Sequence, residues 1–461
     1  MMYQVNFNHP VWVHFIGIGG ISMSGLAHIL LGAGFRVTGS DNKESELTCR
    51  LIGEGAEIFY GQKAENIDPA MDVVVYTAAV HPDNPEYKRC TELNLPMLTR
   101  AQLLGEVMNN YDASVAVSGT HGKTTTTSMI SEIALKADLD PTISVGGMLR
   151  SIDGNIRVGH SPLFIAEACE YSNSFLSLYP KIAVILDIDA DHLDFFKDLN
   201  DIRHSFHIFA QHLPADGTLI INASIEKYQE IISDAVCSIV TYGLDRGDYH
   251  ASDIRFDTYG CGSFTLIRRG KNAGRFTLRV PGIHNVSNAV ASLAAADLIG
   301  ADLKAETEGL DNFTGTDRRF ERKGEVNGFT VIDDYAHHPT EIRATLTAAR
   351  NYPHEKIWCI FQPHTYTRTK ALMDEFADAL TLADEVVLAD IYAAREKDNL
   401  GISSDTLRER IARNNTPVHY FPSFGQIEDY ILQNAHTGDL VITMGAGDVY
   451  KVGDELLKKS R

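Results

Sequence analysis

Short hydrophobic runs alternate with amphipathic stretches along most of the chain, as they do in proteins built from parallel strands and crossover helices. In the first part of the chain, a hydrophobic run at residues 11–17 ends in a glycine-rich turn, and a helical pattern at residues 24–31 follows it. Further strands are predicted at residues 37–41, 73–79 and 96–98. These segments predict a first block of alternating strands and helices.

Two more blocks of the same kind follow. The second begins with a buried-strand pattern at residues 113–118, a loop at 119–125 and a helix that continues to residue 134. Its later elements are predicted as strands at 163–167, 182–188 and 218–222, antiparallel hairpins at 246–280 and an alanine-rich helix at 281–299. The third block has predicted strands at 330–333, 357–361, 385–389 and 440–443. We expect the boundaries between blocks near residues 110 and 315.

The composition is that of a globular protein with several cores, since 44% of the 461 residues are hydrophobic and 22% are charged. The formal net charge is −20, with 61 acidic against 41 basic residues. An acidic surface repels nucleic acid and anionic membranes, so we expect neither as a partner. The six cysteines form no C-x-x-C pair, residues 1–10 lack the layout of a signal peptide, and no hydrophobic run is long enough to span a membrane. We therefore expect a cytoplasmic protein.

A phosphate-binding loop is predicted at Gly-Thr-His-Gly-Lys-Thr, residues 119–124, between a strand and a helix. Such loops need glycines to turn backbone N–H groups toward phosphate, a Lys for the phosphate charge, and a Ser or Thr for Mg²⁺. Val117 stands where the full pattern has its first glycine, so the loop is a shortened variant. The pattern predicts ATP binding here.

A second glycine-rich turn, at residues 17–25, follows the first strand, and Asp41 ends the next one. This is the layout of a dinucleotide site, with a pyrophosphate at a helix N-terminus and an acid near the ribose. Ser22 replaces the third glycine of that pattern. The turn therefore fits NAD, another nucleotide diphosphate, or a purely structural role.

Acidic and basic side chains follow several predicted strands. Glu170 and the segment from Asp187 to Asp194 come after two strands of the second block, where carboxylates and an imidazole can hold Mg²⁺ beside the phosphate loop. In the third block, residues 333–339 and 362–369 follow strands, so their polar side chains are expected to face a cleft. Arg residues there suit phosphate or carboxylate.

Taken together, these segments resemble the Mur ligases of peptidoglycan synthesis, and most closely the branch that adds L-alanine. The resemblance follows nearly the whole chain in order, through the motifs HFIGIGGISMSGLA, VSGTHGKTTTT, EACEYSNSF, DADHLD, GIHNVSNA, RRFE, DDYAHHPTE and FQPHTYTRT. It implies an α/β enzyme of three domains. These would be an N-terminal Rossmann-like UDP-sugar domain at 1–110, a central P-loop ATPase-like domain with a mixed sheet at 111–314, and a C-terminal Rossmann-like domain at 315–461.

The resemblance also implies the reaction. ATP, with two Mg²⁺ ions, would activate the lactyl carboxylate of UDP-N-acetylmuramate as an acyl phosphate, which the amine of L-alanine then attacks. The protein would act as a monomer or homodimer.

Matching the motifs assigns roles to individual residues. The resemblance implies that the UDP-sugar lies at Gly17, Gly19, Gly20 and Asp41, and that the metal ligands are Thr124, Glu170 and His192. It implies that ATP contacts Gly119, Thr120, His121, Gly122, Lys123, Thr124, Thr125, Asn285, Asn288, Arg319 and Asp334, with His284 nearby. The implied catalytic residues are Lys123, His337, His364 and Arg368.

The chain departs from many relatives at Cys169, Asp187 and Thr365, where Asp, Asn and Arg are often found. Three alternatives stay open. A recycling ligase of the same family would add a tripeptide to UDP-N-acetylmuramate. A nucleotide-dependent dehydrogenase would use the first glycine-rich turn but leave Lys123 and the third block unexplained. A non-catalytic nucleotide-binding regulator would not need so many closely spaced acids.

Overall fold

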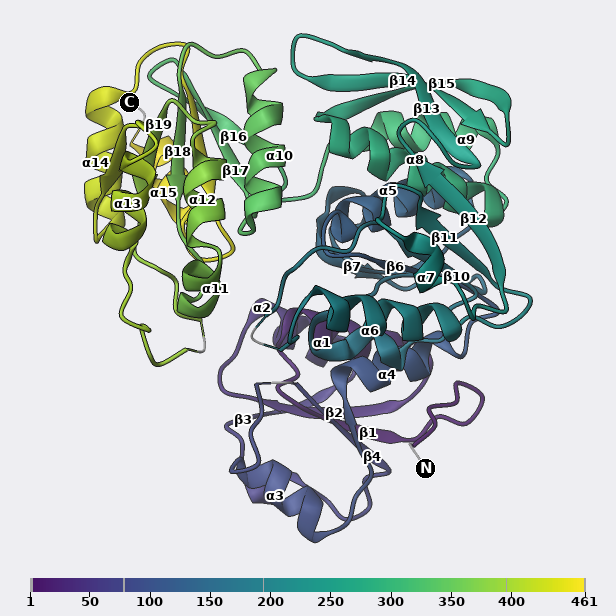
Figure 1. The fold of residues 1–461 in the computed structure, drawn as a ribbon. Coiled ribbons are helices and arrows are strands. Elements are labelled where there is room, and N and C mark those ends of the chain that lie inside the picture. Colours follow the sequence, from purple (N-terminus) through teal and green to yellow (C-terminus); the bar gives the residue numbers. More distant parts are fainter. Residues whose placement is uncertain (1–2, 78, 194, 395, 460–461) are drawn as a thin grey trace.

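Three β-sheets, each covered by helices, organise the chain in the computed structural model, which describes residues 3–77, 79–193, 195–394 and 396–459. In Figure 1 the N-terminal sheet lies at the bottom, the middle sheet above it, and the C-terminal sheet beside the middle one. The α/β class with three such units confirms the predicted fold.

The N-terminal sheet is fully parallel, in the strand order β3-β2-β1-β4-β5. Its strands are β1 (Trp12–Ile16), β2 (Arg36–Asp41), β3 (Glu57–Tyr60), β4 (Val73–Tyr76) and β5 (Met97–Thr99). Its helices are α1 (Ile21–Gly32), α2 (Glu46–Gly53), α3 (Pro85–Glu92) and α4 (Arg100–Met108). The strand order reverses between β1 and β4, which is where ligands bind in such sheets.

The middle sheet has ten strands, in the order β15-β14-β13-β12-β11-β10-β6-β9-β7-β8. Its strands are β6 (Ala113–Ser118), β7 (Thr142–Leu149), β8 (Gly154–Arg157), β9 (Leu163–Glu167), β10 (Ile182–Ile185), β11 (Thr218–Asn222), β12 (Ser238–Gly243), β13 (Tyr249–Phe256), β14 (Cys261–Arg268) and β15 (Lys271–Pro281). Its helices are α5 (Lys123–Lys136), α6 (Leu199–Gln211), α7 (Tyr228–Ile231), α8 (Ile283–Leu298) and α9 (Leu303–Asn312). Antiparallel pairing is confined to the hairpins β13-β14-β15 and to β8, so the sheet is mixed.

The C-terminal sheet is parallel except for its edge strand β16, and its order is β16-β17-β21-β18-β19-β20. The strands are β16 (Glu321–Val326), β17 (Phe329–Asp334), β18 (Ile357–Phe361), β19 (Glu385–Leu388), β20 (Val418–Tyr420) and β21 (Leu440–Met444). The helices are α10 (Pro339–Arg350), α11 (Tyr366–Ala371), α12 (Met373–Leu380), α13 (Ser404–Ala412), α14 (Phe424–Asn434) and α15 (Tyr450–Lys458).

The predicted elements agree best with the structure in the buried centre of each sheet. The strands predicted at 113–118, 163–167 and 357–361 have the bounds observed for β6, β9 and β18. The strand predicted at 182–188 was too long, because β10 ends at Ile185 and the last residues begin a loop. Strands β3, β7, β8, β12, β16 and β20 were not predicted, because they are short or only partly buried.

The N-terminal and middle sheets share one hydrophobic core. Buried side chains of β1 and α4 belong to the same cluster as those of β9 and α6. Tyr111 joins the two parts, because its ring stacks on Phe164 at a centroid distance of 5.0 Å and meets Phe7 edge-on at 5.9 Å. The C-terminal sheet has separate cores on its two faces. Movement between the first two units would therefore expose apolar surface.

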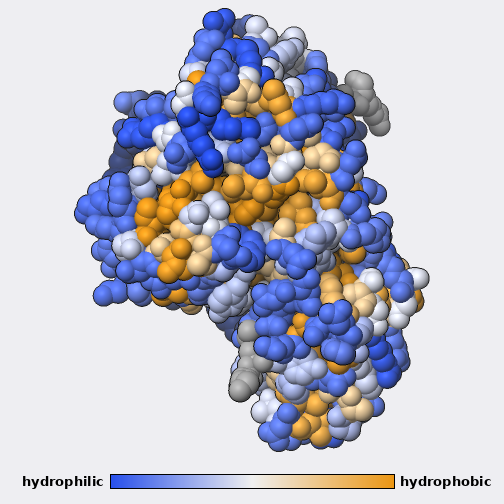
Figure 2. Space-filling model, turned by 90° about the vertical axis from the view of Figure 1, so that its right-hand side faces the viewer, coloured by the Kyte–Doolittle hydropathy of each residue, from blue (hydrophilic) through white to orange (hydrophobic). Residues whose placement is uncertain are grey.

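Figure 2 shows the molecule from the right-hand side of Figure 1. Hydrophobic residues gather there in a band across the broader upper part, with hydrophilic residues around it. Within the described ranges, no helix has both the length and the apolarity required to cross a bilayer.

The junction between α4 and the middle unit provides a test of this packing. A Cβ added at Gly105 would lie 1.9 Å from the backbone oxygen of Ser177, so we expect Gly105→Ala to destabilise the protein by about 1–3 kcal/mol. Gly53, the last residue of α2, has open space around the same position. We expect Gly53→Ala to stabilise slightly, by about 0.5–1 kcal/mol. Urea unfolding of both variants measures the difference, and equal effects would contradict it.

Candidate active site

The predicted phosphate loop lies at the topological switch point of the middle sheet. It follows β6, which lies between β10 and β9, so the ends of all three strands meet there. Gly119 and Gly122 have φ values of 140° and 82°, a backbone region that favours glycine. Gly122 also caps the N-terminus of α5, and Lys123 is the first residue of that helix. An anion in front of this loop would face the positive end of α5.

Lys123 holds the loop in shape from within. Its Nζ donates hydrogen bonds to the backbone oxygens of Gly119 at 2.6 Å and Thr120 at 3.0 Å. Its ammonium lies 2.9 Å from Oε2 of Glu170. Burial lowers the pKa of Lys123, but Glu170, followed by Cys169 and Glu167, raises it more, so the side chain stays charged. The ammonium is thus fixed beside the position a phosphate would take.

Two of the predicted metal ligands lie together, and the third bonds to a different acid. His192 Nε2 is 3.8 Å from Oε1 of Glu170, which is buried. The Thr124 hydroxyl instead donates to Oε2 of Glu167 at 2.9 Å. Oε2 of Glu170 is shielded from solvent, and apart from its ion pair with Lys123 it accepts no hydrogen bond from a described residue. Asp194, which belongs to the same motif, lies outside the described residues.

A cavity of about 230 Å³ opens beside the phosphate loop, between the middle and C-terminal units. Residues predicted to contact ATP line it, namely His121, Gly122, Thr125, Asn285, Asn288, Arg319 and Asp334, together with His284. Its apolar wall is formed by Leu186, Tyr242, Val280, Phe313 and Phe320. The cavity therefore joins an apolar compartment, suited to a base, to the phosphate loop.

The polar groups of this cavity are held in place by the backbone. Both oxygens of Asp334 accept backbone N–H groups, from Phe320 at 2.8 Å and Ala336 at 2.7 Å. Burial raises the pKa of Asp334 to about 6, although Arg319 opposes the rise. Burial, and then Arg319, lowers the pKa of His284 to about 4, so its imidazole is neutral at pH 7.

The three predicted catalytic residues of the C-terminal unit face the middle unit. Arg368 donates from Nε at 3.1 Å and Nη2 at 2.8 Å to one oxygen of Asp191. Nδ1 of His364 lies 3.2 Å from Nη1 of the Arg368 guanidinium. The rings of His337 and His364 pack edge-on against each other. Burial, followed by His337 and Arg368, lowers the pKa of His364 to about 4. A neutral imidazole and a guanidinium thus lie at the boundary between the units.

The glycine-rich turn of the N-terminal unit has a simpler set of contacts than the site around the phosphate loop. Asp41 accepts the backbone N–H of Gly19 at 2.8 Å, and Gly20 caps α1. A Cβ at Gly19 would approach Asp41 to 2.8 Å. The carboxylate predicted to lie near the nucleoside therefore also fixes the turn, while Gly17, Gly19 and Gly20 all belong to the β1–α1 connection as expected.

Arg100, and the partners of Glu341 and Asp189, could not be predicted from the sequence. Arg100 begins α4, which packs against the segment after Glu170. Glu341 lies 3.3 Å from His121 and 3.2 Å from His337, and Asp189 accepts the Thr340 hydroxyl at 2.6 Å. The motif DDYAHHPTE contains Glu341, but its partners come from distant parts of the chain. A pattern along the chain does not reveal such pairs.

Three family models match consecutive parts of the chain. The model described as "Mur ligase family, catalytic domain" matches residues 12–112, "Mur ligase middle domain" matches 117–296, and "Mur ligase, glutamate ligase domain" matches 318–447. A protein named UDP-N-acetylmuramate–L-alanine ligase from Lachnospira eligens is 57% identical over 99% of this chain and 100% of its own length. The chain belongs to the Mur ligase family.

Other Mur ligases agree with this placement. A UDP-N-acetylmuramate–L-alanine ligase from Agathobacter rectalis is 56% identical over 99% of this chain and its own full length. The crystal structure of UDP-N-acetylmuramate–alanine ligase from Thermotoga maritima has a TM-score of 0.80 and 30% identity, covering 97% of this chain and 99% of that one. A murein peptide ligase from Psychrobacter arcticus has a TM-score of 0.72 and 26% identity, covering 97% and 98%. Membership of a ligase family disfavours the dehydrogenase and regulator alternatives.

Asp187 offers a test of the loop in this Mur ligase. Its Oδ1 accepts the backbone N–H of His121 at 2.8 Å, and an Asn side chain can accept the same bond. We expect Asp187→Asn to change the KM for ATP by less than a factor of about 5. Asp187→Leu leaves that N–H unpaired, so we expect a rise of roughly 5–150-fold, matching about 1–3 kcal/mol. A KM for ATP in the Leu variant equal to that of the parent would show that the loop does not depend on this bond.

Proposed function

We propose that this Mur ligase joins L-alanine to the lactyl carboxylate of UDP-N-acetylmuramate while converting ATP to ADP and phosphate. The observation that carries the proposal is the phosphate loop, whose Lys123 is held 2.9 Å from Glu170 beside a cavity walled by the C-terminal unit. The relatives of 56% and 57% identity that match over their whole length bear the name of this activity. Residues 1–110 would bind the UDP-sugar, 111–314 would bind ATP, and 315–461 would close over both and bind the amino acid.

The reaction needs positioning and charge neutralisation more than acid–base groups. An oxygen of the lactyl carboxylate attacks the γ-phosphorus of ATP, the bond to the β–γ bridging oxygen breaks, and ADP leaves. The amine of L-alanine then attacks the carbonyl carbon of the acyl phosphate. A tetrahedral intermediate collapses to the amide, releasing phosphate, and the amine loses one proton.

Lys123 and the loop N–H groups would hold the transferring phosphoryl group. The fixed ammonium and the N-terminus of α5 both face the place where negative charge grows. In the cavity, Asn285 and Asn288 would lie beside the nucleoside, while Arg319 and Asp334 would reach the phosphates and the ribose from the C-terminal unit.

The residues near Lys123 fit Mg²⁺. Glu170 is buried with both carboxylate oxygens within 3.1 Å of the Lys123 ammonium, and Thr124 and Glu167 supply further hard oxygens. Glu170, Thr124 and His192 would hold the metal, which would neutralise the phosphate oxygens when bound. Glu170 would exchange its contact with Lys123 for this role.

In the C-terminal unit, Arg368, His364 and His337 would orient the acyl phosphate and the carboxylate of alanine. Arg368 already binds one carboxylate, that of Asp191, through two of its nitrogens. His364 is neutral near pH 7, because burial lowers its pKa to about 4, and its Nδ1 accepts a hydrogen bond from Arg368, so its Nε2–H would donate to an oxygen of the acyl phosphate.

Arg100 would serve the sugar substrate. No described residue forms a hydrogen bond or ion pair with its guanidinium, although it lies near Glu167 and Cys169 and burial lowers its pKa. An unpaired cation at the N-terminus of α4 favours an anionic ligand.

A cytoplasmic location fits the use of ATP and six free cysteines.

Phosphate release measures the proposed activity. The protein is incubated with ATP, Mg²⁺ and UDP-N-acetylmuramate, and with either L-alanine or the tripeptide that a murein peptide ligase uses. We expect release only when both the sugar nucleotide and L-alanine are present. Turnover with the tripeptide but not with alanine would replace the proposal with the recycling activity, and turnover with neither would overturn both.

Lys123→Met tests the role of the ammonium while keeping the length of the side chain. We expect turnover to fall by at least about 10²–10³-fold, since one preorganised charge is lost, while UDP-N-acetylmuramate binding stays close to wild type. Lys136→Met, at the other end of α5, is the matched control and should keep its activity. If sugar binding is also lost in Lys123→Met, the two glycine-rich sites are not separate.

Arg100→Ala tests the predicted sugar contact. We expect the KM for UDP-N-acetylmuramate to rise roughly 10–100-fold, the equivalent of one hydrogen bond to a charged group, with the KM for ATP unchanged. Arg50→Ala is the control, because Arg50 is 63% exposed and pairs with Glu54 on α2. A rise in the KM for ATP alone would assign Arg100 to the nucleotide instead.

A further inference from the structure

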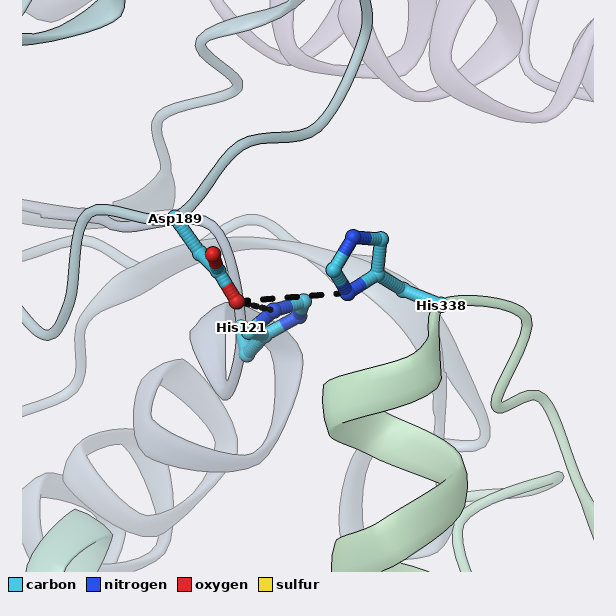
Figure 3. Close-up of side chains that lie close together, drawn as sticks. All are labelled: His121, Asp189 and His338. Atoms are coloured by element: carbon cyan, nitrogen blue, oxygen red, sulfur yellow. Dashed lines mark ion pairs between the residues drawn. The ribbon is translucent and has the colours of Figure 1, made fainter. Parts of the chain in front are cut away.

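Two histidines and a carboxylate converge where the C-terminal unit meets the middle unit (Figure 3). His121 belongs to the phosphate loop, Asp189 to the loop after β10, and His338 to the N-terminal cap of α10. One potential ligand atom from each lies within 4.8 Å of the other two. Nε2 of His121 is 3.5 Å, and Nδ1 of His338 is 4.0 Å, from Oδ2 of Asp189. Among the described residues, no other group of three such side chains meets this criterion.

The surroundings of His338 select the ring nitrogen that could bind a metal. Its Nε2 lies 3.2 Å from the backbone oxygen of Ala190, an acceptor that requires a proton on this nitrogen. The lone pair is then on Nδ1, the atom that faces Asp189. The competing donor, the backbone N–H of Thr340, is 3.4 Å away, which is a weak bond.

His121 is oriented in the same way by a carboxylate. Its Nδ1 lies 3.3 Å from Oε1 of Glu341, and its Nε2 points toward Asp189. Both ring nitrogens are shielded from solvent, and neither meets the geometry of a hydrogen bond with a described residue. A carboxylate on one side of a histidine and a metal on the other is a recurring arrangement in metal sites, because it fixes the tautomer and raises the basicity of the ligand.

The charges at the cluster favour a cation. Three carboxylates surround His121: Asp189 lies 3.5 Å and Glu341 lies 3.3 Å from its ring nitrogens, and Asp187 accepts its backbone N–H at 2.8 Å. A dication bound here would be offset by these negative charges.

We propose that His121, Asp189 and His338 form a binding site for a transition-metal dication, Zn²⁺ in chemical class, which ties the C-terminal unit to the phosphate loop. Two imidazoles and one carboxylate suit Zn²⁺ rather than Mg²⁺, which prefers oxygen ligands. Zn²⁺ bonds of about 2.0–2.1 Å place tetrahedral donors about 3.4 Å apart, so the ligands need to move only slightly. The fourth position stays open.

This site is distinct from the proposed Mg²⁺ ligands. It shares no residue with Thr124, Glu170 and His192, and its ligands come from both units rather than from the middle unit alone. His121, Thr340 and Glu341 line the nucleotide cavity, so a metal here would sit at its phosphate end.

Cobalt provides a direct probe. Full-length protein, freed of metal with a chelator, is titrated with Co²⁺, whose visible absorption reports imidazole coordination in a site of low symmetry. We expect one equivalent to bind, to resist excess Mg²⁺, and to be displaced by Zn²⁺. Absence of a visible band, or displacement of Co²⁺ by Mg²⁺, would overturn the proposal.

Variants identify the ligands. We expect His338→Ala and Asp189→Asn each to weaken Co²⁺ binding by at least about 100-fold, and Glu341→Gln, which changes only the support of His121, by about 10–100-fold. His207→Ala is the control, because His207 lies on α6, 3.4 Å from Asp234, away from the cluster. Asp189→Asn keeps the α10 cap that His338→Ala removes, so it covers the case in which the latter fails to fold.

The second readout concerns the link between the two units. Zn²⁺ should raise the midpoint of thermal unfolding of the parent protein and of His207→Ala, and should leave Asp189→Asn unchanged. Equal shifts in all three proteins, or wild-type Co²⁺ affinity in Asp189→Asn, would place the metal elsewhere and overturn the proposal.

Discussion

The ion pair between Lys123 and Glu170 is the interaction on which the site depends. Lys123 bonds to the backbone of the phosphate loop and pairs with Glu170 in the segment after β9, so the loop, α5 and this segment are held in one geometry. Both side chains are largely buried, at 13% and 2% exposure, and removing one partner would leave an uncompensated charge that costs about 3–5 kcal/mol. Phosphate and metal would compete for the same two groups. In the free protein, each of the two side chains thus occupies the place that a bound metal or phosphate would take beside the other.

The middle unit contacts the N-terminal and the C-terminal unit in different ways, and each kind of contact suits the function proposed for that unit. The N-terminal unit shares an apolar core with it, so separating the two would expose hydrophobic surface. The C-terminal unit has its own cores and meets the middle unit through polar pairs, Arg368 with Asp191 and Thr340 with Asp189, and through the rings of Tyr259 and Tyr352. The polar pairs can be exchanged for substrate charges at little net cost. The C-terminal unit, which is proposed to close over the substrates, is therefore attached by polar contacts that substrate charges can replace.

Sequence patterns identified the buried centre of each sheet and failed at its edges. β6, β9 and β18 are mostly hydrophobic and almost fully buried, because both faces of a parallel strand are covered. β16 reads Glu-Arg-Lys-Gly-Glu-Val and pairs with only one neighbour, so its strand conformation depends on the ladder with β17 rather than on its own residues. The length predicted for β10 was too great because Leu186 is buried in the following loop.

The chain by itself determined the local features of the site: the positive-φ glycines of the phosphate loop, the lysine that follows them, and the order of motifs that identifies a Mur ligase. The roles predicted for individual residues stay predictions. Only the tertiary structure decided that Asp191 meets Arg368 and that Glu341 faces His121. Those pairs join residues separated by as many as 177 positions. Local conformation follows from neighbouring residues, whereas electrostatic partners are set by how whole sheets pack.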